Sequence, residues 1–245
     1  MARMTVKKLK AEVDALREQV ETHNRQIGLL VKAVENHARG QPPYEMQGYL
    51  RDIDPSLDFS AQPAPGPPTP PWSPVDLRGR LPTANRIKYP TAVYGARSLD
   101  GIFGVTLHYT AAPRWQLIDA VAAYQVSDAA VPQTGAGVPF PGLAYTLAVD
   151  GYGDVYLAHD LTTRVWHNAA VVNGQGRNYT HIGIVYTGDT EPNAQQLVGL
   201  REAIAWCERQ LGRGLDVEGH RDAGLSTGCP GPAWPSWRDA VLPTG

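Results

Sequence analysis

The stretch that most constrains how this 245-residue chain can fold is Glu218-Gly-His-Arg-Asp-Ala-Gly-Leu-Ser-Thr-Gly-Cys-Pro-Gly-Pro232. It holds His220 and Cys229, with two glycines between them and a Cys-Pro-Gly sequence at the end, a composition typical of a loop. A neutral imidazole and a thiolate both bind zinc well. Because a loop can bring both side chains onto one ion and a regular helix or strand of this length cannot, we expect a metal site here.

A catalytic zinc ion usually takes three protein ligands and leaves a fourth position for water, so another segment must supply one more ligand. The best candidate is His108, in Gly104-Val-Thr-Leu-His-Tyr109, a short run of apolar and β-branched residues followed by turn residues. This pattern predicts a buried strand that carries His108 at its carboxyl end. Binding sites are often built at strand ends and on the loops beyond them.

Six motifs then follow one another along the chain: His108-Tyr-Thr-Ala111, Ala144–Tyr156, Val165-Trp-His-Asn-Ala169, Ile182-Gly-Ile184, Gly219-His-Arg-Asp222 and Thr227-Gly-Cys-Pro230. In this order and spacing the chain, over residues 75–243, resembles the zinc-dependent N-acetylmuramoyl-L-alanine amidases. These are the type-2 amidases of phages and bacteria, related to animal peptidoglycan recognition proteins. The resemblance implies an α/β fold with a mixed central β-sheet flanked by α-helices, and a zinc ion in a groove. It also implies hydrolysis of the amide between N-acetylmuramic acid and L-alanine.

The resemblance assigns roles to seven side chains. They are His108, His220 and Cys229 as zinc ligands, Tyr145 and Thr227 as catalytic groups, and His167 with Trp166 as substrate-binding groups of the groove. One position departs from part of the family, because Val185 stands where some relatives carry a glutamate after the Ile-Gly-Ile element. Proton transfer would then fall to Tyr145 and the catalytic water.

The chemistry explains why these residue types are needed. Water is a poor nucleophile and an unactivated amide a poor electrophile, and zinc acts on both. A tyrosine hydroxyl can accept or donate a hydrogen bond and can bond the tetrahedral oxyanion, which gives Tyr145 a role. Thr227 can donate to the same oxyanion, but it lacks the positive charge of the lysine that some relatives have there.

Each assignment has a simpler alternative. Cys229 could form a disulfide with Cys207, but Cys207 falls on the apolar face of a helix predicted over 193–211, which favours a core role for it. His108 and Tyr145 could be core residues of strands, and His167 a surface loop residue; the other motifs favour the site.

Other features complete the prediction for the carboxyl-terminal part. His159 and His181 carry no supporting pattern and are expected at the surface or at strand ends, and Arg221 and Asp222 are expected to order their loop by hydrogen bonds. The expected elements are a helix over 114–126 with Trp115, Ile118 and Ala122 on one face, strands over 144–149 and 154–158 joined by a turn at 150–154, and a short helix over 235–241.

The amino-terminal 40 residues have a different pattern. Apolar residues and two histidines recur at alternating steps of three and four: Val6, Leu9, Val13, Leu16, Val20, His23, Ile27, Leu30, Val34 and His37. This narrow seam predicts a coiled coil, since a helix packed on a globular domain would need a broader apolar stripe. β-branched residues at the a positions and Leu at d favour a parallel dimer, while His23 and His37 at d leave a trimer open.

The coiled coil gives the chain three predicted segments. Residues 1–40 form a coiled-coil helix that makes a homo-oligomer through residues 5–38, residues 41–74 a proline-rich linker, and residues 75–245 the zinc amidase domain. A coiled-coil tether would suit a mount on a larger particle such as a phage tail, so virion proteins are further candidate partners.

Composition excludes several classes. A net charge of −2 gives no electrostatic case for nucleic acid, and no apolar run approaches the roughly 20 residues that span a bilayer. The first residues lack the apolar core of a signal peptide. We therefore expect production in a host cytoplasm, followed by release to the cell wall or by incorporation in a virion tail.

Two other functions compete with a peptidoglycan amidase. One is a catalytically silent protein that binds peptidoglycan, and the other is a structural virion protein with an amidase-like domain. Silent relatives usually lack the cysteine ligand, so the presence of Cys229 favours the enzyme. His108, Tyr145 and His220 favour it too, whereas Val185 removes one possible catalytic group.

Overall fold

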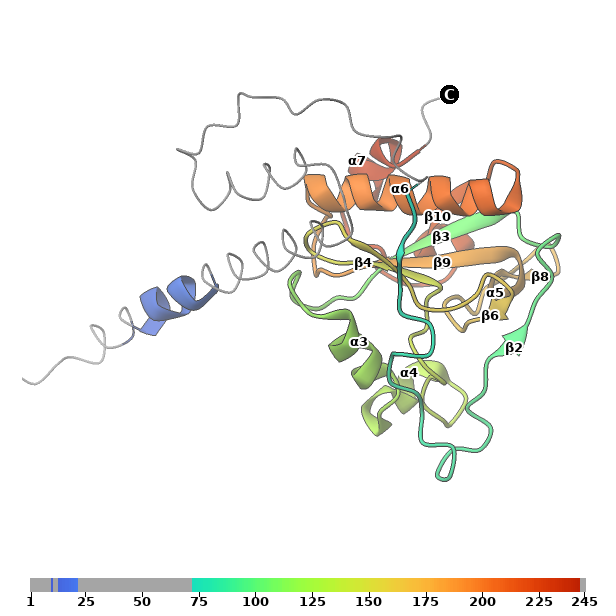
Figure 1. Cartoon of the computed structure of the whole chain (residues 1–245), viewed down its shortest axis with the longest axis horizontal. Coiled ribbons are helices and arrows are strands. Elements are labelled where there is room, and N and C mark those ends of the chain that lie inside the picture. Colours follow the sequence, from blue (N-terminus) through green and yellow to red (C-terminus); the bar gives the residue numbers. More distant parts are fainter. Residues whose placement is uncertain (1–9, 11–12, 22–71, 243–245) are drawn as a thin grey trace, which may run out of the picture. The chain divides into compact units, whose positions relative to one another are not determined.

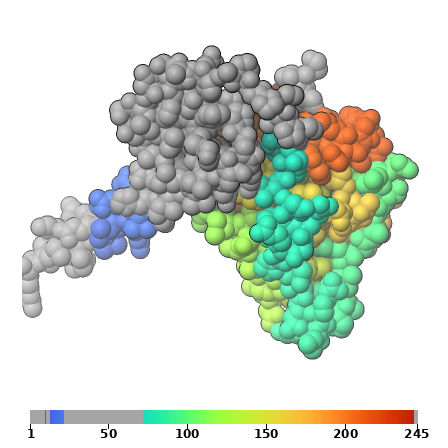
Figure 2. Space-filling model, in the orientation of Figure 1, coloured from blue at the N-terminus to red at the C-terminus, as the bar shows by residue number. Residues whose placement is uncertain are grey.

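A computed structural model describes residues 10, 13–21 and 72–242, which are the coloured parts of the cartoon (Figure 1) and of the space-filling view (Figure 2). The chain divides into two compact units, Met1–Trp72 and Ser73–Gly245. In the first unit, residues 13–21 are helical with exposed side chains. The rest of the predicted seam over 5–38 and nearly all of the linker lie outside the described residues, so the oligomer and the three-segment division remain predictions.

The second unit is built on a six-stranded sheet with the order β1-β5-β4-β9-β3-β10. Its strands are β1 (Val75–Asp76), β3 (Gly104–Tyr109), β4 (Leu147–Val149), β5 (Val155–Leu157), β9 (His181–Tyr186) and β10 (Asp216–Gly219). Only β4 and β5 pair antiparallel, and every other pair in this sheet is parallel. The prediction of a mixed sheet is therefore confirmed.

The remaining elements lie around this sheet. Two small ribbons pair β2 (Gly95–Ala96) with β6 (Thr163–Arg164) and β7 (Val171–Val172) with β8 (Gln175–Gly176). The α-helices are α3 (Ile118–Gln125), α4 (Val131–Thr134), α5 (Arg177–Thr180), α6 (Ala194–Leu211) and α7 (Trp234–Trp237), and the 3-10 turns are η1 (Asp128–Ala130), η2 (His220–Ala223) and η3 (Arg238–Ala240).

Helices cover both faces of the sheet, with α6 on one side and α3 on the other (Figure 1). The helix α6 begins at a capping box formed by Asn193 and Gln196 and ends at Gly212 in the left-handed conformation. Its buried face includes Leu200, Ile204 and Cys207, as the periodicity predicts. Both cysteines are free, so the disulfide alternative is wrong.

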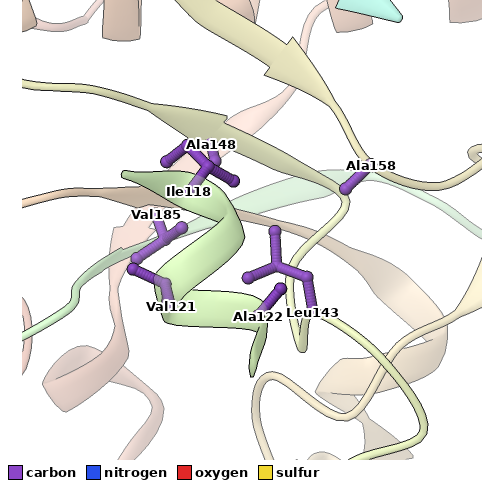
Figure 3. Close-up of a cluster of buried hydrophobic side chains, with 7 residues drawn as sticks. All are labelled: Ile118, Val121, Ala122, Leu143, Ala148, Ala158 and Val185. Atoms are coloured by element: carbon purple, nitrogen blue, oxygen red, sulfur yellow. The ribbon is translucent and has the colours of Figure 1, made fainter. Parts of the chain in front are cut away.

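The opposite face packs on α3. Ala148 of β4 and Val185 of β9 form a cluster with Ile118, Val121 and Ala122, shown with Leu143 and Ala158 in Figure 3. Side chains of a strand alternate between faces, so residues next to Val185 point to α6 instead. His108 pairs with Val185 in the register of β3 and β9 and therefore lies on the α3 face.

The helix α3 is shorter than the predicted helix over 114–126. Leu117 has an extended backbone, with ψ at 143°, so the helix begins only at Ile118. Trp115 precedes it, is 42% exposed and packs on Tyr152 at 4.8 Å between ring centroids, which makes its predicted place on the helix wrong.

The predicted hairpin is confirmed, because β4 and β5 pair antiparallel on either side of residues 150–154. The first of these strands begins at Leu147, later than predicted, which leaves Tyr145 in the segment before it. His181 does begin a strand, but it is buried rather than at the surface. Within the described part of the chain, no helix has the length and apolar character needed to cross a bilayer.

Candidate metal centre

The carboxyl ends of β3 and β10 lie side by side. Leu107 pairs with Gly219, so the next residue on each segment, His108 and His220, emerges at the same place. The centroids of the two imidazole rings are 4.5 Å apart, and His108 is almost completely buried. Parallel pairing of two strands far apart in the sequence thus places the two histidines together.

The loop after η2 brings the cysteine to the same point. The Arg221 guanidinium donates to the carbonyl oxygens of Gly228 and Gly231, and the Asp222 carboxylate accepts from the Gly219 amide and the Trp234 indole N–H. These bonds fix the loop, as predicted for Arg221 and Asp222. The Sγ atom of Cys229 lies 3.6 Å from Nδ1 of His108.

These three side chains fit a zinc ion. Their donor atoms all lie within 4.8 Å of one another. Zinc–nitrogen and zinc–sulfur distances near 2.0 and 2.3 Å would put a tetrahedral nitrogen–sulfur pair about 3.5 Å apart, close to the 3.6 Å between Nδ1 of His108 and Sγ of Cys229. The Nε2 atom of His220 is buried and has no hydrogen-bond partner among the described residues, which is rare unless a ligand is expected there.

Burial shifts the pKa values of the three groups. It lowers the pKa of His108 and of His220, so both imidazoles are neutral and offer a lone pair at neutral pH. Burial also raises the pKa of the Cys229 thiol to about 12. The thiol therefore keeps its proton until a cation replaces it, and metal binding would release that proton.

Tyr145 lies beside this cluster, with its ring centroid 5.0 Å from that of His108. Burial raises the pKa of its hydroxyl well above the usual value of 10, so the group is protonated at neutral pH and can donate a hydrogen bond. Thr227 accepts a 3.2 Å hydrogen bond from the Cys229 amide through Oγ1 and also lines the groove beside the cluster. Both predicted catalytic groups thus stand next to the three donor atoms.

The groove has a volume of about 700 Å³, within the usual range for a ligand site. Its lining includes Tyr145, Arg164, Trp166, His167, His220 and Thr227. Trp166 is partly buried against the cluster of Ala130, Phe140 and Ala144 and presents the rest of its surface to the groove.

Val185 contributes only to the core. Its side chain is fully buried against the helix α3, at the register position of His108. No carboxylate enters the site from this position of β9.

His167 is 5% exposed, and both of its ring nitrogens have partners within the protein. Nδ1 lies 3.1 Å from Nε2 of His108, and Nε2 lies 3.1 Å from the backbone oxygen of His181. His167 is among the residues that line the groove, but both of its ring nitrogens already have partners.

Sequence reasoning missed part of the groove. Arg164 lines it with its guanidinium over the Tyr179 ring, 4.5 Å from the centroid, and Asn168 and Asn178 lie nearby. Arg164 precedes the Trp166-His167 motif by two residues, so its closeness to that motif was a usable signal. Nothing in the sequence placed Tyr179 opposite it.

The sequence matches the Amidase_2 family model, described as N-acetylmuramoyl-L-alanine amidase, over residues 99–232, more than half of the chain. The matched range contains His108, Tyr145, His220 and Cys229. A comparison with curated proteins gave no significant match.

Several solved structures are similar to this one. Drosophila peptidoglycan recognition protein SA is 16% identical, with 68% of this chain and 92% of that chain covered, at a TM-score of 0.51. The endolysin amidase LysCS from Clostridium intestinale URNW is 16% identical, with 71% and 100% covered, at a TM-score of 0.48. The endolysin of Thermus scotoductus MAT2119 bacteriophage Ph2119 is 19% identical, with 70% and 100% covered, at 0.47. The likeness to recognition protein SA supports the same fold.

Proposed function

Since the chain belongs to the N-acetylmuramoyl-L-alanine amidase family, we propose that it is a zinc-dependent peptidoglycan hydrolase that cleaves the amide between N-acetylmuramic acid and L-alanine. The observation that carries the proposal is the convergence of His108, His220 and Cys229, whose donor atoms lie within 4.8 Å of one another at the edge of a groove. Two neutral imidazoles and a thiol form a donor set that suits zinc.

In this proposal His108, His220 and Cys229 hold the zinc ion. When bound, zinc would supply a water of lowered pKa and a positive charge beside the scissile carbonyl. The chain itself supplies the hydrogen bonds: the protonated Tyr145 hydroxyl donates to the oxygen that becomes negative in the transition state. Thr227 donates a second, neutral hydrogen bond to the same oxygen, and Trp166 contacts the substrate with the part of its ring that lines the groove.

The test is zinc content measured together with the release of new amino termini from peptidoglycan, for the wild type and for Cys229→Ser. We expect one zinc per wild-type chain, and loss of zinc and of cleavage in the variant. Cys207→Ser is the matched control, because Cys207 is a buried core residue on α6. Zinc without cleavage in the wild type would favour a catalytically silent, peptidoglycan-binding protein instead. Absence of zinc from the wild type would contradict the proposed metal site and with it the proposed function.

The amino-terminal segment belongs to a separate proposal. We propose that residues 1–40 form a coiled coil that joins two or three chains, that residues 41–74 tether it, and that the amidase domain begins near residue 75. A phage origin with a virion-tail mount, or release from the host cytoplasm as an endolysin, would suit this arrangement. Sedimentation of the full chain and of a chain lacking residues 1–40 tests it: the full chain should be a dimer or trimer and the shortened chain a monomer.

A further inference from the structure

Three groups at the base of the groove form a continuous hydrogen-bonded series. The backbone oxygen of His181 lies 3.1 Å from Nε2 of His167, and Nδ1 of His167 lies 3.1 Å from Nε2 of His108. The other nitrogen of His108, Nδ1, lies 3.6 Å from Sγ of Cys229. The series therefore connects the backbone of β9 to the cluster of metal-ligand candidates.

The direction of these hydrogen bonds follows from the chemistry of the first member. A carbonyl oxygen can only accept, and the His181 oxygen also accepts from the Arg97 guanidinium. His167 must therefore carry its hydrogen on Nε2, which leaves Nδ1 of the neutral ring as an acceptor. His108 must then donate from Nε2, and its Nδ1 is left with a lone pair.

We propose that His167 is a positioning residue, which holds His108 as the Nε2–H tautomer and so directs the Nδ1 lone pair toward Cys229 and His220. The proposal rests on the metal role of His108 in the proposed function. It differs from a substrate-binding role for His167, because both nitrogens of that ring are engaged within the protein. A hydrogen-bond partner behind a metal-binding histidine fixes its tautomer and its ring orientation.

The fold leaves space for the His167 ring against the strand β9. Gly183 of β9 lies directly under it, and a Cβ added at this glycine would be 2.6 Å from Cγ of His167. Because this separation is shorter than any normal contact, the ring can occupy its place only while residue 183 has no side chain. The planes of the two rings are nearly perpendicular, at 87°, and their centroids lie 5.3 Å apart.

The experiment compares two substitutions at the same position. In His167→Phe a ring of similar shape remains without either nitrogen, whereas in His167→Asn the Oδ1 atom takes about the place of Nδ1 and can still accept from His108. The tautomer of His108 is determined by ¹⁵N NMR of the metal-free protein, and zinc affinity is determined by competition with a chromogenic chelator. Circular dichroism and thermal unfolding check that each variant is folded.

We expect the Nε2–H form of His108 in the wild type and in His167→Asn, and a mixture with the Nδ1–H form in His167→Phe. We also expect His167→Phe to bind zinc about 10- to 100-fold more weakly, and His167→Asn to recover a large part of that loss. An Nδ1–H tautomer in the wild type, or equal zinc affinity in all three proteins, would overturn the proposal.

Gly183→Ala provides an independent variant, because it keeps both histidines and displaces the His167 side chain, whose Cγ and Cβ would lie 2.6 and 2.8 Å from the added Cβ. It should change the His108 tautomer and the zinc affinity in the same direction as His167→Phe. A folded Gly183→Ala protein with wild-type values would contradict the proposal. None of these measurements uses peptidoglycan, so a chain that binds zinc as described but cleaves no amide would refute the proposed function and leave this inference standing.

Discussion

Two polar clusters share one face of the strands β3 and β10. Thr106 and His108 are two residues apart on β3, so their side chains point to the same side, and Glu218 and His220 follow the same order beside them. The first cluster is centred on Glu218 and the second on the metal-ligand candidates. They differ in whether the chain itself supplies a partner of opposite charge.

In the Glu218 cluster the carboxylate has partners on both oxygens. It accepts from the Thr106 hydroxyl and from the Arg177 guanidinium, each at 3.0 Å, and Nε2 of His181 lies 3.8 Å away. An opposite charge and a hydroxyl group of the chain thus satisfy both carboxylate oxygens, and Nε of Arg177 is the one atom of this ion pair that is buried without a hydrogen-bond partner among the described residues. Its geometry requires no ligand, so we interpret it as a structural tie between α5, β9 and β10.

In the second cluster, the atoms that face one another are all potential metal ligands. Two imidazoles and a thiol stand within 4.8 Å without a carboxylate, and Nε2 of His220 has no hydrogen-bond partner among the described residues. A buried group without a partner costs stability unless a ligand or water completes it. A buried polar cluster therefore indicates a ligand site where several potential ligand atoms converge without an opposite charge from the chain.

The largest effect is expected from breaking the Glu218 cluster. Arg177→Met would leave a largely buried carboxylate without its ion-pair partner, and the free energy of unfolding should fall by about 3–5 kcal/mol. Urea denaturation measures it, and zinc affinity should stay unchanged. Arg78→Met removes a cation paired with Asp76 at an exposed site, so it should cost at most about 1 kcal/mol. Equal costs for the two variants would refute the structural interpretation of the Glu218 cluster.

A smaller effect, and one of a different kind, is expected from Tyr145→Phe. The variant loses the hydroxyl that donates to the oxyanion but keeps its ring beside His108, so kcat should fall about 100-fold while zinc content stays at the wild-type value. Steady-state hydrolysis of peptidoglycan fragments and metal analysis measure both quantities. Full turnover with normal zinc would contradict the role given to Tyr145.

The smallest effect is expected on the stability of the protein when the pH is lowered, through one buried histidine. Burial lowers the pKa of His181 to about 4, against 6.5 for a free histidine, so between these values the unfolded chain binds more protons than the folded chain. The part of the free energy of unfolding that depends on His181 is fully present above pH 6.5. It decreases as the pH falls toward 4, by about 2 kcal/mol at pH 5. Because burial also lowers the pKa values of His108 and His220, the loss due to His181 is measured as the difference between the wild type and His181→Asn in urea denaturation of the metal-free proteins at pH 7.5 and pH 5. His181→Asn should show a shallower pH dependence, and an identical slope would show that another group is responsible.

Much of the fold could be predicted from local patterns. The apolar run ending at Tyr109 gave the strand β3, the turn at 150–154 gave the hairpin, and the spacing of Leu200, Ile204 and Cys207 gave the buried face of α6. Each pattern reports a regular period that burial imposes on consecutive residues. The start of α3 could not be predicted, because the extended backbone at Leu117 leaves no mark in the apolar period.

The candidate site could also be predicted only in part from the sequence. Residue types and the order of the motifs were enough to propose His108, His220 and Cys229, since few side chains bind zinc and the loop around Cys229 is rich in glycine and proline. The place of His167 could not be obtained from the sequence. Its partner His108 is 59 residues away in the chain, and the space that its ring occupies depends on Gly183 of the strand β9.

The sequence by itself determined which chemistry this chain can carry, because residue identity alone decides which groups can bind a metal, donate a proton or pack in a core. The tertiary structure decided which of those groups meet. Parallel pairing of β3 with β10 placed His108 beside His220, and the packing of α3 over Val185 put that side chain in the core rather than in the groove. Contacts between residues distant in the chain depend on strand register and on side-chain packing, and neither follows from the local pattern of one segment.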